Sequence, residues 1–211
     1  MNELLTNIGV SMTKGDLPGT VAQCEQAVAE GAGASEILDS LLTAMGALGV
    51  RFKNNEVFVP EVLIAARAMN GGLEVIKPLL ASEGVKSIGK IVIGTVKGDL
   101  HDIGKNLVRM MLVGAGFEVI DVGVDCSAEK YIEALVENEA DILCMSALLT
   151  TTMVNMKTII EKLEEQGIRD KYKVMIGGAP VTQDYADEIG ADRYSPDAAT
   201  AAEVAKLLIC A

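Results

Sequence analysis

From Ile88 onwards, short apolar runs alternate with amphipathic stretches, and this alternation is the strongest constraint on the fold. The apolar runs predict strands, and the stretches whose apolar residues recur every three or four positions predict helices. Strands joined by helical crossovers form a parallel sheet that is covered on both faces. We therefore predict an α/β domain with a five-stranded parallel sheet, Rossmann-like or flavodoxin-like. Strands are expected over 90–96, 117–122, 141–145, 173–177 and 191–194, and helices over 103–115, 127–138, 153–166, 181–189 and 197–209.

The chain before this region shows helical periodicity and no strand pattern. Between Pro60 and Leu80 the apolar residues recur at spacings of three and four, which predicts a helix with one buried stripe. Earlier helices are expected over 2–13, 20–30 and 35–47, and a loop over 52–57. These patterns predict a helical bundle over 1–86 and an α/β domain over 87–211, with a linker at 81–87.

Composition narrows the classes of function. The net charge of −12 argues against a nucleic-acid surface, which needs clustered Lys and Arg. No apolar stretch is long enough for a membrane span, and the N-terminus has no signal pattern. The four cysteines are widely spaced and form no C-x-x-C pair, which argues against disulfides and zinc. We therefore expect a cytoplasmic protein that binds neither nucleic acid nor membrane.

The only histidine of the chain, His101, lies in the segment 98–104, which reads GDLHDIG. This segment follows a predicted strand and precedes a predicted helix. It should therefore lie at the carboxyl edge of the sheet, where open α/β sheets bind ligands. The loops 146–152 and 177–180 and the end of the fifth strand should emerge at the same edge. The sequence thus predicts a cleft around one imidazole.

Several chemistries compete for a single histidine at such an edge. A P-loop is excluded because five residues, instead of four, separate the two glycines of the segment. A hydrolase built from Ser146, His101 and Asp99 would lack the G-x-S-x-G turn, and zinc would need more ligands. A metal that brings its own equatorial ligands needs only one axial imidazole, whose tautomer Asp99 would fix. A hydrogen-bonded surface histidine is the remaining alternative.

Three short motifs carry a family resemblance. Asp99-Leu100-His101-Asp102-Ile103-Gly104 resembles the D-x-H-x-x-G signature of cobalamin-binding domains, Ser146-Ala147-Leu148 resembles their S-x-L, and Gly177-Gly178 resembles their later G-G. The order and separations agree, with 41 residues between the first two motifs and 28 between the last two. Upstream, the segments 45–52 and 56–62 resemble the helical cap of methionine synthase and of corrinoid proteins in methanogen and acetogen methyltransferase systems. The chain is thus similar to a stand-alone corrinoid methyl carrier.

The resemblance implies a role for each site residue. His101 would be the axial ligand of cobalt, and Asp99 and Ser146 would form a hydrogen-bonded relay that adjusts how strongly the imidazole donates. Phe52 and Val59 would cover the upper face of the corrin; Val59 fits ordinary bundle core equally well, whereas an aromatic residue in a loop favours the cap role for Phe52. The remaining residues expected to hold the corrin and its displaced nucleotide tail are Gly98, Asp102, Ile103, Gly104, Leu148, Thr150, Gly177, Gly178, Ala179 and Ser195.

The same resemblance implies a function. The cobalt of cobalamin would cycle between Co(I), as cob(I)alamin, and methyl-Co(III), as methylcobalamin. A substrate-specific methyltransferase would supply the methyl group, a second methyltransferase would pass it to tetrahydrofolate or a thiol, and a reductive activase would be a further partner. The chain would not be catalytic alone. Two alternatives are the small subunit of an adenosylcobalamin-dependent isomerase, which usually lacks the helical cap, and a cobalamin-based sensor, which would need a DNA-binding module.

Overall fold

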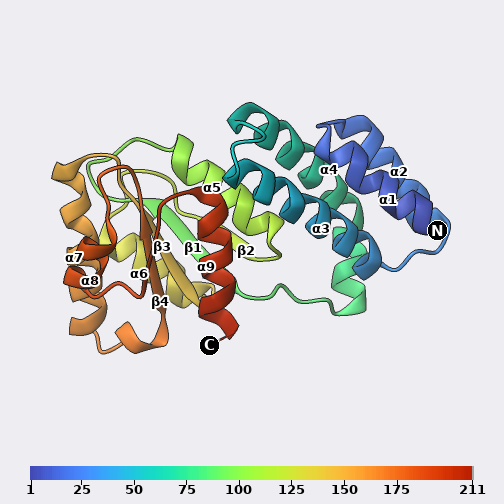
Figure 1. Ribbon diagram of the computed structural model, residues 1–211. Coiled ribbons are helices and arrows are strands. Elements are labelled where there is room, and N and C mark those ends of the chain that lie inside the picture. Colours follow the sequence, from blue (N-terminus) through green and yellow to red (C-terminus); the bar gives the residue numbers. More distant parts are fainter. Residues whose placement is uncertain (211) are drawn as a thin grey trace. The chain divides into compact units, whose positions relative to one another are not determined.

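The computed structural model describes residues 1–210 and divides into two compact units (Figure 1). The first unit comprises Met1–Ser87 with Gly114–Gly116, and the second comprises Ile88–Val113 with the residues from Phe117 onwards. None of the helices in the described part of the chain is both long and apolar enough to cross a membrane.

The first unit contains the helices α1 (Asn2–Thr13), α2 (Leu17–Ala29), α3 (Ala34–Lys53) and α4 (Val59–Glu83). Asp16 begins α2, because its carboxylate accepts a hydrogen bond from the Gly19 N–H at 3.0 Å. Gly84 ends α4 in the left-handed conformation that favours glycine. The helices pack around a core of fully buried aliphatic side chains, which includes Ile8, Met12, Ile37, Leu41, Met69 and Ile76. The helical bundle predicted for this region is confirmed.

Helix α3 extends beyond its predicted end, and the loop predicted over 52–57 is wrong in its first residues. The buried stripe of α3 continues at helical spacing through Met45 and Leu48, and the basic residues of its last turn complement the carbonyl end of the helix. Phe52 therefore lies in the last turn of α3 and is half-buried. Phe52 is therefore not an aromatic residue in a loop, and its predicted cap role loses that reason.

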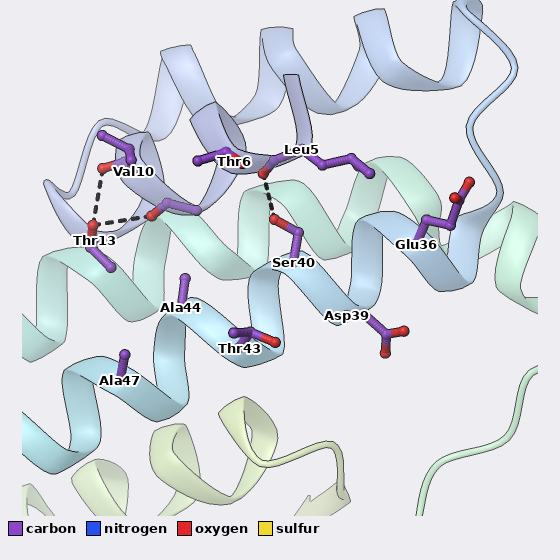
Figure 2. A pocket seen from close by; sticks show the side chains of 11 residues that line it. Leu5, Thr6, Val10, Thr13, Glu36, Asp39, Ser40, Thr43, Ala44 and Ala47 are labelled. Carbon is purple, nitrogen blue, oxygen red and sulfur yellow. Dashed lines mark hydrogen bonds between the residues drawn. The ribbon is translucent and has the colours of Figure 1, made fainter. Parts of the chain in front are cut away.

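A groove of about 540 Å³ runs between α1 and α3 (Figure 2). Short side chains line most of it, and the Ser40 hydroxyl crosses from α3 to donate to the Leu5 carbonyl at 2.5 Å. Gly9 and Ala44 bring the two helices close together, since a Cβ on Gly9 would lie 3.0 Å from that of Ala44. The lining residues include none of the predicted site residues, so this groove is separate from the predicted cofactor site.

The second unit is a parallel sheet with the strand order β2-β1-β3-β4-β5, and all its strand pairs within the described residues are parallel. This is the predicted flavodoxin-like arrangement. The strands are β1 (Lys90–Thr95), β2 (Glu118–Asp121), β3 (Ile142–Ser146), β4 (Lys173–Gly177) and β5 (Arg193–Ser195). The connecting helices are α5 (Ile103–Gly114), α6 (Ala128–Glu137), α7 (Thr150–Glu165), a 3-10 turn η1 (Arg169–Lys171), α8 (Gln183–Ile189) and α9 (Ala198–Cys210).

The two faces of the sheet are covered by different helices. Val92, Leu143 and Val174 pack with α6, α7 and α8 in one apolar cluster, whereas α5 and α9 cover the opposite face (Figure 1). Helix α5 leaves β1 towards one face and connects it to β2, whereas α7 leaves β3 towards the other face and connects it to β4, so the strand order reverses between the neighbouring strands β1 and β3. In such sheets this switch point is where a ligand crevice forms. It places the β1–α5 and β3–α7 loops on either side of the candidate site.

Candidate functional site

The β1–α5 loop holds His101 against Asp99. His101 Nδ1 lies 2.7 Å from Asp99 Oδ1, and the His101 backbone N–H donates to the same oxygen at 3.1 Å. A carboxylate only accepts, so this contact assigns the proton to Nδ1 and leaves Nε2 as the nitrogen with a free lone pair. The Asp99 side chain is completely buried, while that of His101 is 50% exposed. The loop thus presents one oriented imidazole nitrogen at the carboxyl edge of the sheet.

The second carboxylate oxygen of Asp99 is held from the β3 side of the crevice. The Thr152 hydroxyl donates to Oδ2 at 2.7 Å, and the Leu148 N–H donates to it at 2.8 Å. Burial raises the pKa of the Asp99 carboxyl, but the bonds from Thr152, Leu148 and His101 outweigh burial and hold this pKa well below its usual range. Asp99 is therefore ionised at neutral pH, and its charge makes the free ring nitrogen of His101 a stronger electron-pair donor.

The hydroxyl that reaches Asp99 belongs to Thr152 and not to Ser146, which was predicted for this relay. Ser146 ends β3, and its backbone carbonyl accepts the Val96 N–H at 3.0 Å. Helix α7 begins at Thr150, three residues before its predicted start, and Leu149 before it is the extended N-cap residue. Thr152 consequently lies in the first turn of α7. The run of three threonines is visible in the sequence, but the helix boundary that selects the third is not.

The ends of four strands place small residues side by side. Thr95, Ser146, Gly177 and Ser195 are consecutive partners in the register of β1, β3, β4 and β5, so they form a row across the sheet. Three of them are predicted site residues, and Thr95, which is fully buried, was missed. Thr95 also donates its hydroxyl to the His101 carbonyl at 3.0 Å. This row of small residues lies at the carboxyl edge of the sheet, at the end of the strand that precedes the loop of His101.

Gly178 is required by the close approach of two loops. Its φ of +134° is rare for other residues, and a Cβ would lie 1.8 Å from the carbonyl oxygen of Ala147. Gly104 differs, because a Cβ there would meet no atom of the described residues within 4 Å. Backbone conformation and close packing therefore require glycine at Gly178, whereas no described residue requires glycine at Gly104.

Several large apolar side chains at the β1–α5 and β3–α7 loops are exposed. Leu100 and Ile103 are 71% and 77% exposed, and Leu148 and Leu149 are also exposed. Exposed apolar side chains gathered in this way mark a surface that binds another group. Among the residues that the structure describes, no three His, Cys, Asp or Glu side chains converge as metal ligands.

The other predicted residues belong either to loops of the second unit or to the first unit. Gly98 and Asp102 belong to the β1–α5 loop, and Asp102 accepts a hydrogen bond from the Asn106 side chain at 3.0 Å. Thr150 and Ala179 are exposed at the same sheet edge. Phe52 and Val59 belong to the first unit, where both are half-buried.

The Asp99 carboxylate should make stability depend on pH. Because the folded-state pKa is depressed, its contribution is present above the unfolded pKa of about 3.9 and is lost as the pH falls towards the lower folded value. We expect Asp99→Asn to lower the unfolding free energy by about 1–3 kcal/mol at pH 7 and by less near pH 3. Urea unfolding of the two chains without added cofactor measures this difference. A difference that is equal at both pH values would contradict the assignment.

Comparisons with known proteins agree across both units. A family model described as a B12 binding domain matches residues 89–204, and a second model with the same description matches residues 4–77. The chain is 49% identical over 177 residues to trimethylamine corrinoid protein 1 of Methanosarcina acetivorans, covering 82% of each chain. It is also 49% identical over 178 residues to the dimethylamine corrinoid protein of Methanosarcina barkeri, covering 83% of each.

Solved structures of cobalamin-related proteins resemble nearly the whole chain. The chain is similar to one in the crystal structure of the methanol:cobalamin methyltransferase complex of Methanosarcina barkeri, with a TM-score of 0.89, 31% identity, and coverage of 99% of this chain and 80% of that one. It is also similar to a cobalamin-binding protein of Desulfitobacterium hafniense, with a TM-score of 0.79, 29% identity, and coverage of 97% and 98%.

Proposed function

Because the chain belongs to the family of B12-binding corrinoid proteins, we propose that it carries a methyl group on the cobalt of cobalamin between two methyltransferases. The observation that carries this proposal is the Asp99–His101 pair, with Nδ1 bonded at 2.7 Å and the other ring nitrogen available at a half-exposed position. A carrier needs a cofactor that is held from one side and accessible from the other. A single axial ligand at a sheet edge suits this requirement.

The residues of the site fit a corrinoid. His101 would hold the group through one imidazole nitrogen, which is enough for a metal that brings its other ligands with it. The exposed apolar side chains beside His101 suit contact with the largely apolar edge of a macrocycle. The row of Thr95, Ser146, Gly177 and Ser195 offers small side chains where the nucleotide tail of the cofactor is proposed to lie. The proposed roles of Phe52 and Val59 above the corrin belong to the same hypothesis.

When bound, the corrinoid supplies a cobalt atom that accepts and gives up a methyl group. The protein contributes control of the lower ligand. Asp99 is ionised and accepts the Nδ1 proton, which strengthens Nε2 as a donor; a shift of that proton towards Asp99 would strengthen it further. The hydroxyl of Thr152 and the N–H of Leu148 stabilise the carboxylate charge and oppose such a shift. This balance of hydrogen bonds is our proposed means of tuning the ligand strength of His101.

The proposed partners follow from a carrier role. They are a methyltransferase that demethylates a small substrate, a second one that methylates tetrahydrofolate or a thiol, and a reductive activase. Relatives named for trimethylamine and dimethylamine, and one in a methanol methyltransferase complex, define the substrate classes to test first. We also propose a cytoplasmic location, which is consistent with the free thiols of Cys24, Cys126 and Cys144.

A reconstitution tests the carrier role. The chain is loaded in parallel with methylcobalamin and with adenosylcobalamin, and each form is mixed with a thiol acceptor and a thiol-methylating methyltransferase of a methylamine system. We expect methylated thiol from the methyl form, in an amount equal to the bound cobalt, and none from the adenosyl form. The unloaded chain is the control. Turnover that depends on the adenosyl form would contradict the proposal, and so would the absence of transfer from a fully loaded methyl form to both a thiol and tetrahydrofolate, each offered with its own methyltransferase.

A further inference from the structure

The loop that follows β2 contains a residue in a rare backbone conformation. Asp125 has a φ of 51°, in the left-handed region, which aspartate tolerates better than most residues but which still carries strain. Residues persist in such conformations when the surrounding structure fixes them. The hydrogen bonds that keep Asp125 in this conformation therefore show which segment the β2–α6 loop contacts.

Asp125 contacts the β1–α5 loop through both its backbone and its side chain. Its N–H donates to the Asp99 carbonyl at 3.0 Å, and its carboxylate Oδ1 accepts the Gly98 N–H at 2.7 Å. These two bonds enclose the peptide unit that joins Gly98 to Asp99. Gly98 is itself in the left-handed region, with a φ of +80°, so the turn preceding Asp99 is fixed by Asp125.

Further bonds keep the β2–α6 loop alongside the end of β1. The Thr95 N–H donates to the Gly123 carbonyl at 2.9 Å, and the Cys126 N–H donates to the Thr95 carbonyl at 3.0 Å. Asp125 lies between these two attachment points in the sequence. Its position against Gly98 is therefore set by the sheet and does not depend on a flexible loop.

Asp99 is consequently held from two sides. The β3–α7 side holds its carboxylate through Thr152 and Leu148, and Asp125 holds its backbone from the β2 side. Within the described residues the hydrogen bonds of Asp125 to this loop go to Gly98 and Asp99 and not to the imidazole, so Asp125 acts through Asp99. We propose that Asp125 is a positioning residue that fixes Asp99, and thereby keeps His101 aligned as the axial ligand. This inference rests on the proposed function.

Three variants separate the side chain of Asp125 from its backbone conformation. Asp125→Gly keeps the left-handed conformation at no steric penalty but removes the acceptor for Gly98. Asp125→Asn keeps both the conformation and an acceptor oxygen. Glu139→Gly is the matched control, because Glu139 also has a left-handed φ, of 49°, and lies at the end of α6, at the opposite edge of the sheet from His101.

Each variant is loaded with cobalamin and reduced to cobalt(II), and electron paramagnetic resonance measures the fraction of cobalt that carries a nitrogen axial ligand. We expect Asp125→Gly to lower the ratio of ligated to unligated cobalt by about threefold or more. The reason is the loss of one partly solvated hydrogen bond, from the Gly98 N–H to the Asp125 carboxylate. Asp125→Asn and Glu139→Gly should match the parent chain. Amide exchange of the unloaded protein should show Gly98 protected in the parent and unprotected in Asp125→Gly.

The outcomes distinguish this inference from the proposed function. An unchanged ratio in Asp125→Gly, in a parent protein that is nitrogen-ligated, overturns the role of Asp125 and leaves the carrier function intact. An unligated parent protein contradicts the proposed function itself. If Asp125→Gly does not fold, the amide exchange of the parent decides, because rapid exchange at Gly98 would show that Asp125 does not hold it.

Discussion

Loaded with cobalamin, the His101→Ala variant is expected to lose the absorption spectrum of nitrogen-ligated cobalt and to show that of cobalamin without a lower base. The reason is that His101 is the only histidine of the chain, and its ring is the one imidazole at the sheet edge. Removing a partner that supports a metal ligand typically reduces metal affinity or activity by about 10–100-fold. Removing the ligand itself should therefore reduce methyl transfer by at least about 100-fold.

Added imidazole provides the control for this variant. In His101→Gly, free imidazole has room to enter, and it should restore the spectrum of the ligated cobalt. It should restore less of the transfer rate, because a free imidazole is not held by Asp99 at 2.7 Å. Thermal unfolding of the unloaded variants should be close to that of the parent, since the His101 side chain is half exposed. A parent spectrum that survives both substitutions would remove His101 from the role of ligand.

The edge of the sheet that carries the site could be predicted from the sequence because it follows from topology. Alternating strands and helices imply a parallel sheet, and a parallel sheet collects the loops after its strands at one edge. The position of His101 after β1 follows from the order of strands and helices alone. The strand order β2-β1-β3-β4-β5 confirms this prediction and places β1 beside β3, so that the loops of His101 and Leu148 face one crevice.

Features that depend on the exact start of a helix or on the register of the strands could not be predicted. Thr152 reaches Asp99 only because α7 begins at Thr150, and boundaries of helices are poorly marked when threonines can belong to a loop or to a first turn. Thr95 becomes a neighbour of Ser146 only through the register of β1 and β3. Phe52 was predicted to lie in a loop because the adjacent Asn54 and Asn55 suit a turn, yet α3 continues through Lys53 and the turn begins only after it.

Gly178→Ala is expected to destabilise the protein and to disturb the site, although Gly178 makes no contact with His101. Alanine strongly disfavours a φ of +134°, and its Cβ would lie 1.8 Å from the Ala147 carbonyl oxygen. Because that atom belongs to the backbone, the β3–α7 loop must move. The unfolding free energy should fall by about 2–4 kcal/mol, from the combined backbone strain and overpacking. Urea unfolding of the unloaded chain measures this loss.

The same displacement of the β3–α7 loop should weaken the binding of His101 to cobalt. Ala147 precedes Leu148, whose N–H holds the Asp99 carboxylate at 2.8 Å, so displacement of this loop removes one support of the carboxylate that orients His101. The nitrogen-ligated fraction of cobalt should therefore fall in Gly178→Ala under conditions in which the variant remains folded. A variant that is destabilised but fully ligated would show that Asp99 does not depend on Leu148.

Gly104→Ala is the matched substitution, because it adds the same methyl group at the other motif glycine. A Cβ at Gly104 meets no described atom within 4 Å and lies in the first turn of α5, so stability should be unchanged or higher by up to about 1 kcal/mol. If the space beside Gly104 is occupied by the corrinoid, the variant should bind cobalamin at least about tenfold more weakly, about 1.4 kcal/mol. Urea unfolding together with equilibrium dialysis then separates the two variants: Gly178→Ala loses stability, and Gly104→Ala loses affinity alone. Unchanged affinity in Gly104→Ala would mean that this glycine does not contact the cofactor.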